Sequence, residues 1–91
     1  MRTKVNVAAQ VRDYQRALAP EVRRAMKAAI LALPAGDTKP LSDELEGFHR
    51  LRVGHHRVIY RHHAGQIECF LAAPRALIYE YLAGHLHDLL D

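Results

Sequence analysis

One basic segment of the sequence carries most of the side chains that can act on a phosphate group. Residues 47–67 contain no Asp or Glu, yet residues 49–63 hold four arginines and five histidines. Guanidinium presents a planar fork of donors that matches phosphate and carboxylate oxygens, and imidazole titrates near neutral pH. Such an excess of basic side chains produces a local positive field. We therefore expect a polyanion or an acidic protein as the partner of this segment.

The arginines of this segment fall at alternate positions of two expected strands, residues 48–53 and 56–62. Side chains two residues apart lie on the same face of a strand. The apolar residues expected to face the core are Leu51, Val53, Val58 and Tyr60. The opposite face then carries Arg50, Arg52, Arg57 and Arg61. Ile59 falls on this basic face, where we expect the C-terminal helix to cover it in part. The alternative interpretation is a solvated face whose arginines only keep the protein soluble.

Arg75 and Tyr79 lie four residues apart in an expected C-terminal helix, residues 75–90, and so one above the other. Beside the arginine strands they would complete a pocket of guanidinium groups, a phenol and imidazoles. This set suits metal-free RNA cleavage, in which the 2′-hydroxyl loses a proton and the leaving 5′-oxygen gains one. A tyrosine base needs adjacent positive charge. The alternative is that Tyr79 packs in the core while Arg75 caps the helix or stays solvated.

The histidines and the cysteine do not indicate a metal site. The adjacent histidines at 55–56 and 62–63 point to opposite faces of their strands, and neither Cys-x-x-Cys nor His-Glu-x-x-His occurs. We therefore expect no metal and no cofactor. We interpret Cys69 as a small buried hydrophobic residue rather than a nucleophile.

Length and composition point to one small domain, residues 1–91. The chain is 49% hydrophobic with a net charge of +3, which excludes a disordered chain. No apolar stretch approaches the roughly 18 residues of a membrane span, and residues 1–5 lack the apolar core of a signal peptide. The single cysteine cannot form an internal disulfide. We expect a cytoplasmic protein that does not contact a membrane.

The expected elements run β-α-α-β-β-β-α, which is an α+β domain. The expected strands are residues 2–7, 48–53, 56–62 and 67–72, and the expected helices are residues 8–18, 20–33 and 75–90. Residues 34–47 form a turn-rich connection that Leu41 and Leu45 anchor to the core. We expect a small antiparallel twisted sheet with the two N-terminal helices on one face. The other face, next to the C-terminal helix, is expected to be partly open.

The run from Leu51 to Arg61, Leu-Arg-Val-Gly-His-His-Arg-Val-Ile-Tyr-Arg, resembles the central signature of the RelE/ParE toxin superfamily of bacterial type II toxin–antitoxin systems. Members typically read Leu-Arg-x-Gly-x-x-Arg, two apolar residues, Tyr and Arg. Residues 74–79 are similar to the family's later Arg and (Val/Ile)-Tyr, and residues 41–47 to its Leu-x-Gly approach. The resemblance favours the RelE-like branch and implies the RelE-like microbial RNase fold.

The resemblance implies a role for each matching residue in ribosome-dependent cleavage of mRNA. Arg57 would stabilise the phosphate in the transition state, Arg75 would contact the scissile region, and Tyr79 would orient or deprotonate the 2′-hydroxyl. The candidate RNA-binding residues are Arg50, Arg52, Arg61, His49 and His56. The implied partners are a cognate antitoxin, the ribosome with its mRNA, and operator DNA bound as a toxin–antitoxin complex.

The sequence departs from the family's pattern at residues 72–74, at Phe48 and in the paired histidines 55–56, and two alternatives stay open. Residues 72–74 read Ala-Ala-Pro where many RelE-like members carry a basic run, and Phe48 stands where the best-known branch has a lysine. One alternative is a ParE-like inhibitor of DNA gyrase, which shares the fold without cleaving RNA. The other is a catalytically weak basic module that binds only its antitoxin or operator DNA. The retained Arg57, Arg75 and Tyr79 favour the nuclease.

Overall fold

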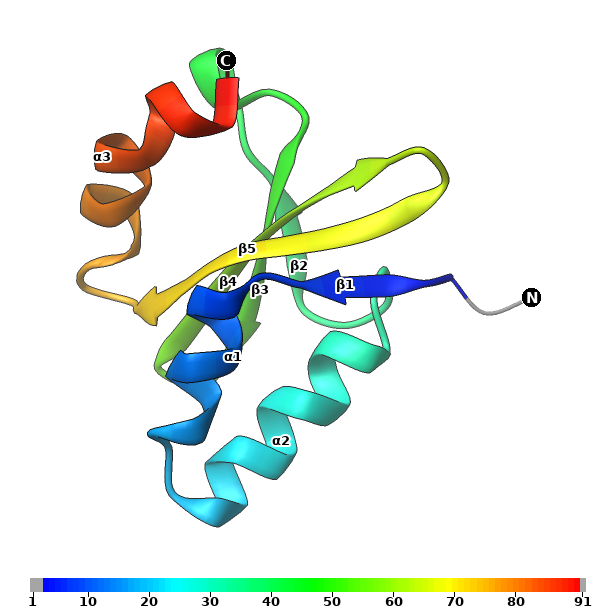
Figure 1. Cartoon of the computed structure of the whole chain (residues 1–91), viewed down its shortest axis with the longest axis vertical. Helices are drawn as coiled ribbons and strands as arrows, with labels where there is room; N and C mark the ends of the chain where they lie inside the picture. The colour runs from blue at the N-terminus through cyan, green and yellow to red at the C-terminus, as the bar shows by residue number, and fades with distance from the viewer. Residues whose placement is uncertain (1–2, 91) are drawn as a thin grey trace.

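The computed structural model describes the backbone of residues 3–90 and the side chains of residues 3–85. The elements are β1 (Val5–Val7), α1 (Ala9–Arg16), α2 (Pro20–Leu31), β2 (Thr38–Pro40), the 3₁₀ turn η1 (Asp43–Leu45), β3 (Phe48–Val53), β4 (His56–His63), β5 (Gln66–Pro74) and α3 (Ile78–Leu90). Figure 1 shows the sheet between two layers, with α1 and α2 on one side and α3 on the other. Within residues 3–90, none of the helices is both long and apolar enough to cross a bilayer.

The five strands form one mixed sheet in the order β1-β5-β4-β3-β2. The strands from β2 to β5 pair antiparallel in chain order, whereas β1 pairs parallel with β5, with Val5 opposite Ile67. The expected antiparallel sheet is therefore correct for the hairpins and wrong at the β1 edge. The sequence analysis also did not predict β2, which lies within the expected connection of residues 34–47. This strand has three residues and ends in Pro40, which has no N–H to donate and suits a sheet edge.

Two glycine turns fix the register of the central hairpins. Gly54 has a φ of +59° and Gly65 a φ of +77°, in the left-handed region that glycine enters without steric cost. The turn at Gly54 joins β3 to β4, and the turn at Gly65 joins β4 to β5. Because the first turn sets the pairing of β3 with β4, it also places Arg52 directly opposite Arg57.

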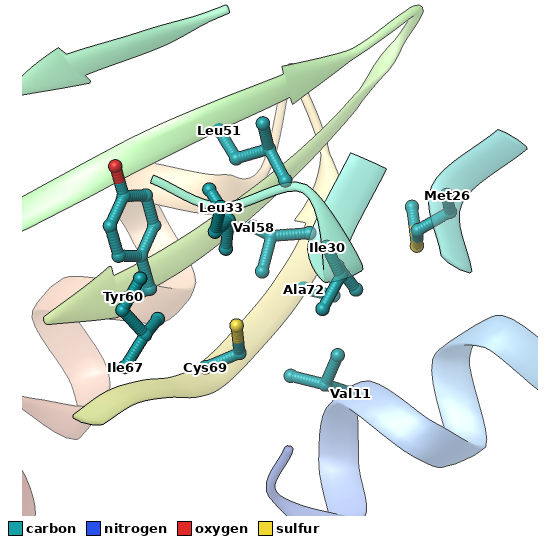
Figure 2. Close-up of a cluster of buried hydrophobic side chains, with 10 residues drawn as sticks. All are labelled: Val11, Met26, Ile30, Leu33, Leu51, Val58, Tyr60, Ile67, Cys69 and Ala72. Carbon is teal, nitrogen blue, oxygen red and sulfur yellow. The ribbon is translucent and has the colours of Figure 1, made fainter. Parts of the chain in front are cut away.

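The first hydrophobic core lies between the sheet and the helices α1 and α2. Figure 2 shows Val11, Met26 and Ile30 from these helices beside the side chains of the sheet. The buried members from the loop after α2 and from the sheet are Leu33, Leu51, Val58, Tyr60, Ile67, Cys69 and Ala72. The assignment of residues 51, 58 and 60 to the core face is thereby confirmed, so the arginines between them point to the other face.

The second hydrophobic core lies between the opposite sheet face and α3. Its buried members are Phe48, Ile59, Leu71, Ala73, Ile78 and Leu82. Ile59 is fully buried, which confirms that the C-terminal helix covers it. Leu41 and Leu45 pack against this core, as expected for the connection that anchors there. The sheet face that was expected to be partly open is thus covered at its centre by α3, and the basic residues of that face lie around the helix.

Candidate functional site

Strand alternation places Arg50 and Arg52 of β3 on the same sheet face as the buried Phe48, toward α3. On β4, Arg57 shares that face with Ile59. The β3–β4 register then sets Arg52 opposite Arg57 and Arg50 opposite Ile59. Three guanidinium groups therefore lie on neighbouring strands at the end of the sheet that holds the Gly54 turn.

Arg57 is the one charged side chain that is buried among those the structure describes, with 7% of its surface exposed. Its Nη1 donates hydrogen bonds to the carbonyl oxygens of Gly54, at 2.8 Å, and His56, at 3.0 Å. Within the described residues no carboxylate forms an ion pair with it. A buried cation without a counter-ion is costly. The position of Arg57 therefore favours binding of an anion.

Arg75 lies in the turn before α3, because the helix begins at Ile78 rather than at residue 75. The expectation that Arg75 lies one helical turn below Tyr79 is therefore wrong. The backbone N–H of Arg75 donates to His55 O at 2.8 Å and extends the β4–β5 pairing, while Leu77 N–H donates to Pro74 O at 2.9 Å and closes the turn. This pairing brings Arg75 to the same end of the sheet as Arg57.

The four residues Arg50, Arg52, Arg57 and Arg75 form what we call the arginine cluster. Burial lowers the pKa of the Arg57 guanidinium from its ordinary value, and the charges of the other three arginines lower it further. Each positive charge therefore makes the next one less favourable. Guanidinium nevertheless stays protonated in proteins, so the cluster presents a concentrated positive charge.

Tyr79 lies in the first turn of α3, with 52% of its surface exposed. The alternative that its ring packs in the core is therefore wrong. The charge of an ionised Tyr79 would favour the protonated form of Arg57 and raise the pKa of the guanidinium, opposite to the effect of the neighbouring arginines. The phenol thus lies within electrostatic reach of Arg57.

A cleft of about 620 Å³ lies between residues 39–45 and α3. Arg50 and Tyr79 both line it, together with Leu45 and Leu82. The cleft joins one arginine of the cluster to a wall of mixed character, because Asp43 and Glu44 line it as well as the leucines. The sequence did not indicate this cleft, because the residues of its outer wall come from the connection before β3.

Asp37 is a charged residue of the site that the sequence analysis missed. Its carboxylate lies 3.8 Å from Arg50 and 3.9 Å from Arg52 and is more than half exposed, while Arg52 N–H donates to Asp37 O. The basic segment, residues 47–67, contains no Asp or Glu. The pairing of β2 with β3 nevertheless brings Asp37 next to the arginines of β3. Exposed ion pairs contribute little to stability. Asp37 therefore offsets part of the charge of the two β3 arginines and does not pair with Arg57.

Arg61 lies on the same face as Arg57 but at the other end of β4. The two are four residues apart, which is roughly 13 Å along a strand. Arg61 pairs with Glu68 at 3.5 Å, and its guanidinium carbon lies 5.5 Å from the centre of the Phe70 ring. The structure therefore does not bring Arg61 into the arginine cluster.

His49 and His56 lie on the opposite sheet face from the arginine cluster, because they alternate with Arg50 and Arg57. The His49 ring stacks on Tyr60 with 5.2 Å between centroids, and burial together with His62 lowers the pKa of His49. The Tyr14 hydroxyl hydrogen-bonds to His56 Nδ1 at 2.6 Å. The two imidazoles therefore do not gather with the arginines. The expectation of one pocket that holds arginines and imidazoles together is wrong for these two residues.

The interpretation of Cys69 as a buried hydrophobic residue is confirmed. The residue is 1% exposed in the first core, and burial raises the pKa of its thiol to about 12. Such a thiol is almost never a thiolate near neutral pH, so it is unsuited to nucleophilic attack. Among the side chains of residues 3–85, no three His, Cys, Asp or Glu gather as potential metal ligands.

Solved structures with the same fold include toxin–antitoxin complexes. The toxin–antitoxin complex RelBE2 from Mycobacterium tuberculosis has a chain with a TM-score of 0.69 at 22% identity, covering 82% of this chain and 100% of that one. The RelB–RelE antitoxin–toxin complex from Methanococcus jannaschii gives a TM-score of 0.67 at 20% identity, covering 84% and 96%. The RelE–RelB complex from Pyrococcus horikoshii gives 0.66 at 23% identity, covering 82% and 97%. No protein-family model and no curated protein sequence matches this chain. The RelE-like fold expected from the sequence is confirmed.

Proposed function

We propose that this chain, which has the RelE-like toxin fold, is the toxin of a bacterial type II toxin–antitoxin system and cleaves mRNA on the ribosome. The observation that carries the proposal is the buried Arg57 at the centre of the arginine cluster, which pairs with no carboxylate of residues 3–85 and lies within electrostatic reach of Tyr79. A buried positive charge of this kind is matched by a phosphate of an RNA backbone. The fold adds support, because the similar solved structures include toxins in complex with antitoxins.

The reaction that fits these groups is attack of a 2′-hydroxyl on the adjacent phosphorus. Tyr79 orients the 2′-hydroxyl or takes its proton, the 2′-oxygen bonds to phosphorus, and the bond from phosphorus to the 5′-oxygen breaks. The leaving 5′-oxygen takes a proton from water, and the products are a 2′,3′-cyclic phosphate and a 5′-hydroxyl. Arg57 stabilises the extra negative charge on the pentacoordinate phosphate, and Arg75 contacts the scissile region. This reaction needs no metal and no cofactor.

Arg50 and Arg52 bind the RNA backbone beside the reacting phosphate. Their positions on β3, next to Arg57, support contacts to successive phosphates of one strand. The cleft that Arg50 and Tyr79 line has room for a neighbouring nucleotide. The ribosome holds the mRNA in place, which explains how so small a site can act. The protein works in the cytoplasm, where its ribosome substrate is.

A cognate antitoxin neutralises the toxin by covering the arginine cluster and the helices with an acidic or amphipathic segment. The exposed arginines of the cluster support an acidic partner, since opposite potentials steer association and set specificity. The toxin–antitoxin complex also binds its operator DNA.

Primer extension on ribosome-bound mRNA after induction of the gene tests the proposal. We expect new 5′ ends within transcripts in cells that express the wild type, and their loss with Arg75→Ala. Arg23→Ala removes the same charge from an exposed position on α2 and serves as the control, which should still cut. Intact transcripts together with inhibited DNA supercoiling would contradict the proposal and favour a gyrase inhibitor.

A further inference from the structure

The strand ends that carry Arg57 and Arg75 are held by three consecutive carbonyl oxygens of the β3–β4 turn. Gly54 O and His56 O accept from Arg57 Nη1, and His55 O accepts from Arg75 N–H. The position of residues 54–56 therefore sets the position of both arginines. A shift of this turn would move Arg57 and Arg75 together.

The β4–β5 pairing holds this turn through one backbone hydrogen bond, from Arg75 N–H to His55 O. His56 lies opposite Pro74 at a non-hydrogen-bonded position of that register, and its own backbone pairs with Val53 of β3. Gly54 and His55 are exposed, and the turn ends the sheet at this edge. The sheet thus holds the backbone of residue 56, and a contact from outside the sheet can restrain its side chain and the exposed turn further.

Helix α1 provides such a contact from the opposite face of the sheet. The Tyr14 hydroxyl hydrogen-bonds to His56 Nδ1 at 2.6 Å, and the two rings meet edge to face with 5.6 Å between centroids. Burial raises the pKa of Tyr14, in keeping with a partly enclosed phenol that stays protonated. The side chain of His56 thus ties the start of β4 to the helix.

The helix itself is fixed to the neighbouring strand by Gln10. Its Nε2 donates to Ala72 O at 2.7 Å, and Ala72 N–H donates to its Oε1 at 2.8 Å, so one side chain occupies both backbone groups of a β5 residue. Gln10 and Tyr14 are four residues apart and share one face of α1. The helix is therefore a fixed base that holds β5 through Gln10 and β4 through Tyr14.

We propose that Tyr14 and His56 are positioning residues for the arginine cluster, acting through the β3–β4 turn from the opposite face of the sheet. Tyr14 holds His56, His56 holds the turn, and the turn carbonyls hold Arg57 and Arg75 where a phosphate binds. The inference rests on the proposed function, because it assigns these residues to the geometry of the RNA-cleaving site. Neither residue touches the substrate.

Hydrogen exchange of the Arg75 amide, which bonds to His55 O, tests the positioning role without any measurement of cleavage. We expect Tyr14→Phe to speed exchange at Arg75 by roughly tenfold, because the local opening of the turn becomes easier. Exchange at Leu51 and Val58, in the first core, should stay unchanged. Arg24→Gln changes an exposed side chain of α2 and should leave Arg75 exchange unaltered. Uniform acceleration at all three amides, or none, would overturn the proposal.

Substitutions of His56 provide the second arm. Asparagine keeps a polar atom near the position of Nδ1, whereas leucine removes it. Exchange of the Arg75 amide should therefore stay slow in His56→Asn and become faster in His56→Leu.

In the cleavage assay we expect Tyr14→Phe to lower kcat by roughly tenfold at similar KM, since misplaced catalytic groups slow the chemical step. If the wild type cleaves no RNA, the proposed function is wrong. Hydrogen exchange at Arg75 still tests whether Tyr14 and His56 position the arginine cluster. If cleavage occurs but exchange does not respond, only the positioning role fails.

Discussion

Arg52 and Arg57 lie directly opposite one another on β3 and β4. Like charges at facing strand positions destabilise a sheet, and Arg57 is buried with no carboxylate partner among the described residues. The sheet therefore carries an unfavourable charge pair at the centre of the candidate site. A phosphate bound at this site would relieve the repulsion, so the proposed ligand should stabilise the folded protein.

Inorganic phosphate is expected to raise the Tm of the wild type and to have little effect on Arg57→Met. Methionine fills a similar volume without the charge. A ligand that binds only the folded state stabilises it by RT ln(1 + [L]/Kd), which is about 1.4 kcal/mol at ten times Kd. Thermal denaturation at increasing phosphate, at constant ionic strength, measures this. Arg23→Met is the matched control and should keep the full shift. An equal shift in wild type and Arg57→Met would contradict the account.

Removal of the Asp37 carboxylate is expected to strengthen anion binding without weakening the fold. Its ion pairs to Arg50 and Arg52 are 3.8 and 3.9 Å long and exposed, so Asp37→Asn should change the free energy of unfolding by less than about 1 kcal/mol. One charge near 4 Å in water is worth about 1 kcal/mol, so phosphate should bind up to roughly fivefold more tightly. Isothermal titration measures the affinity. Asp13→Asn, on α1, should leave it unchanged, and a weaker affinity in Asp37→Asn would refute the prediction.

The stability of the protein is expected to fall as the pH drops below the ordinary pKa of histidine, in part because of His49. Burial and His62 lower the pKa of His49 in the folded state. Between the folded and unfolded pKa values the unfolded chain binds the extra proton, so acidification favours unfolding. Above that window the contribution of His49 to the pH dependence vanishes. Urea denaturation at pH 7.5 and pH 5.5 measures the difference.

The variant His49→Phe keeps a ring to stack on Tyr60 but cannot be protonated. It should show a smaller loss of stability between the two pH values than the wild type. His63→Gln alters an exposed histidine and serves as the control. If His49→Phe and the wild type lose the same stability, His49 does not contribute to the pH dependence.

Cys69 is expected to resist alkylation in the folded protein. Its thiol is buried, and burial raises its pKa to about 12, so it is both inaccessible and protonated. Treatment with iodoacetamide at pH 8, followed by mass spectrometry, should leave the native protein unlabelled and label it fully in guanidinium chloride. Rapid labelling of the native protein would show that the first core opens around β5.

Strand alternation and hairpin turns made the basic face predictable. Once residues 48–53 and 56–62 are assigned as strands, the apolar residues between the arginines fix which face the guanidinium groups occupy, and Gly54 fixes the turn between them. The same rule excludes His49 and His56 from that face, because each is adjacent to an arginine in the sequence. Their candidate role as RNA contacts came from residue type alone, without the geometry.

Long-range pairings made the rest unpredictable. Asp37 reaches Arg50 and Arg52 only because β2 pairs with β3, and β2 has too few residues for a recognisable pattern. Arg75 lies outside α3 because its N–H pairs with His55, a contact between residues twenty positions apart. The Tyr14–His56 hydrogen bond likewise joins two elements whose contact depends on the tertiary fold.

The most direct test is cleavage of a defined mRNA on purified ribosomes by the purified protein, with analysis of the product ends. The account predicts a 2′,3′-cyclic phosphate and a 5′-hydroxyl from the wild type, and a rate lower by at least about 100-fold for Tyr79→Phe. Tyr81→Phe, also exposed on α3, should cleave at the wild-type rate. Ends with a 3′-hydroxyl and a 5′-phosphate, equal rates for the two variants, or no cleavage at all would contradict the account.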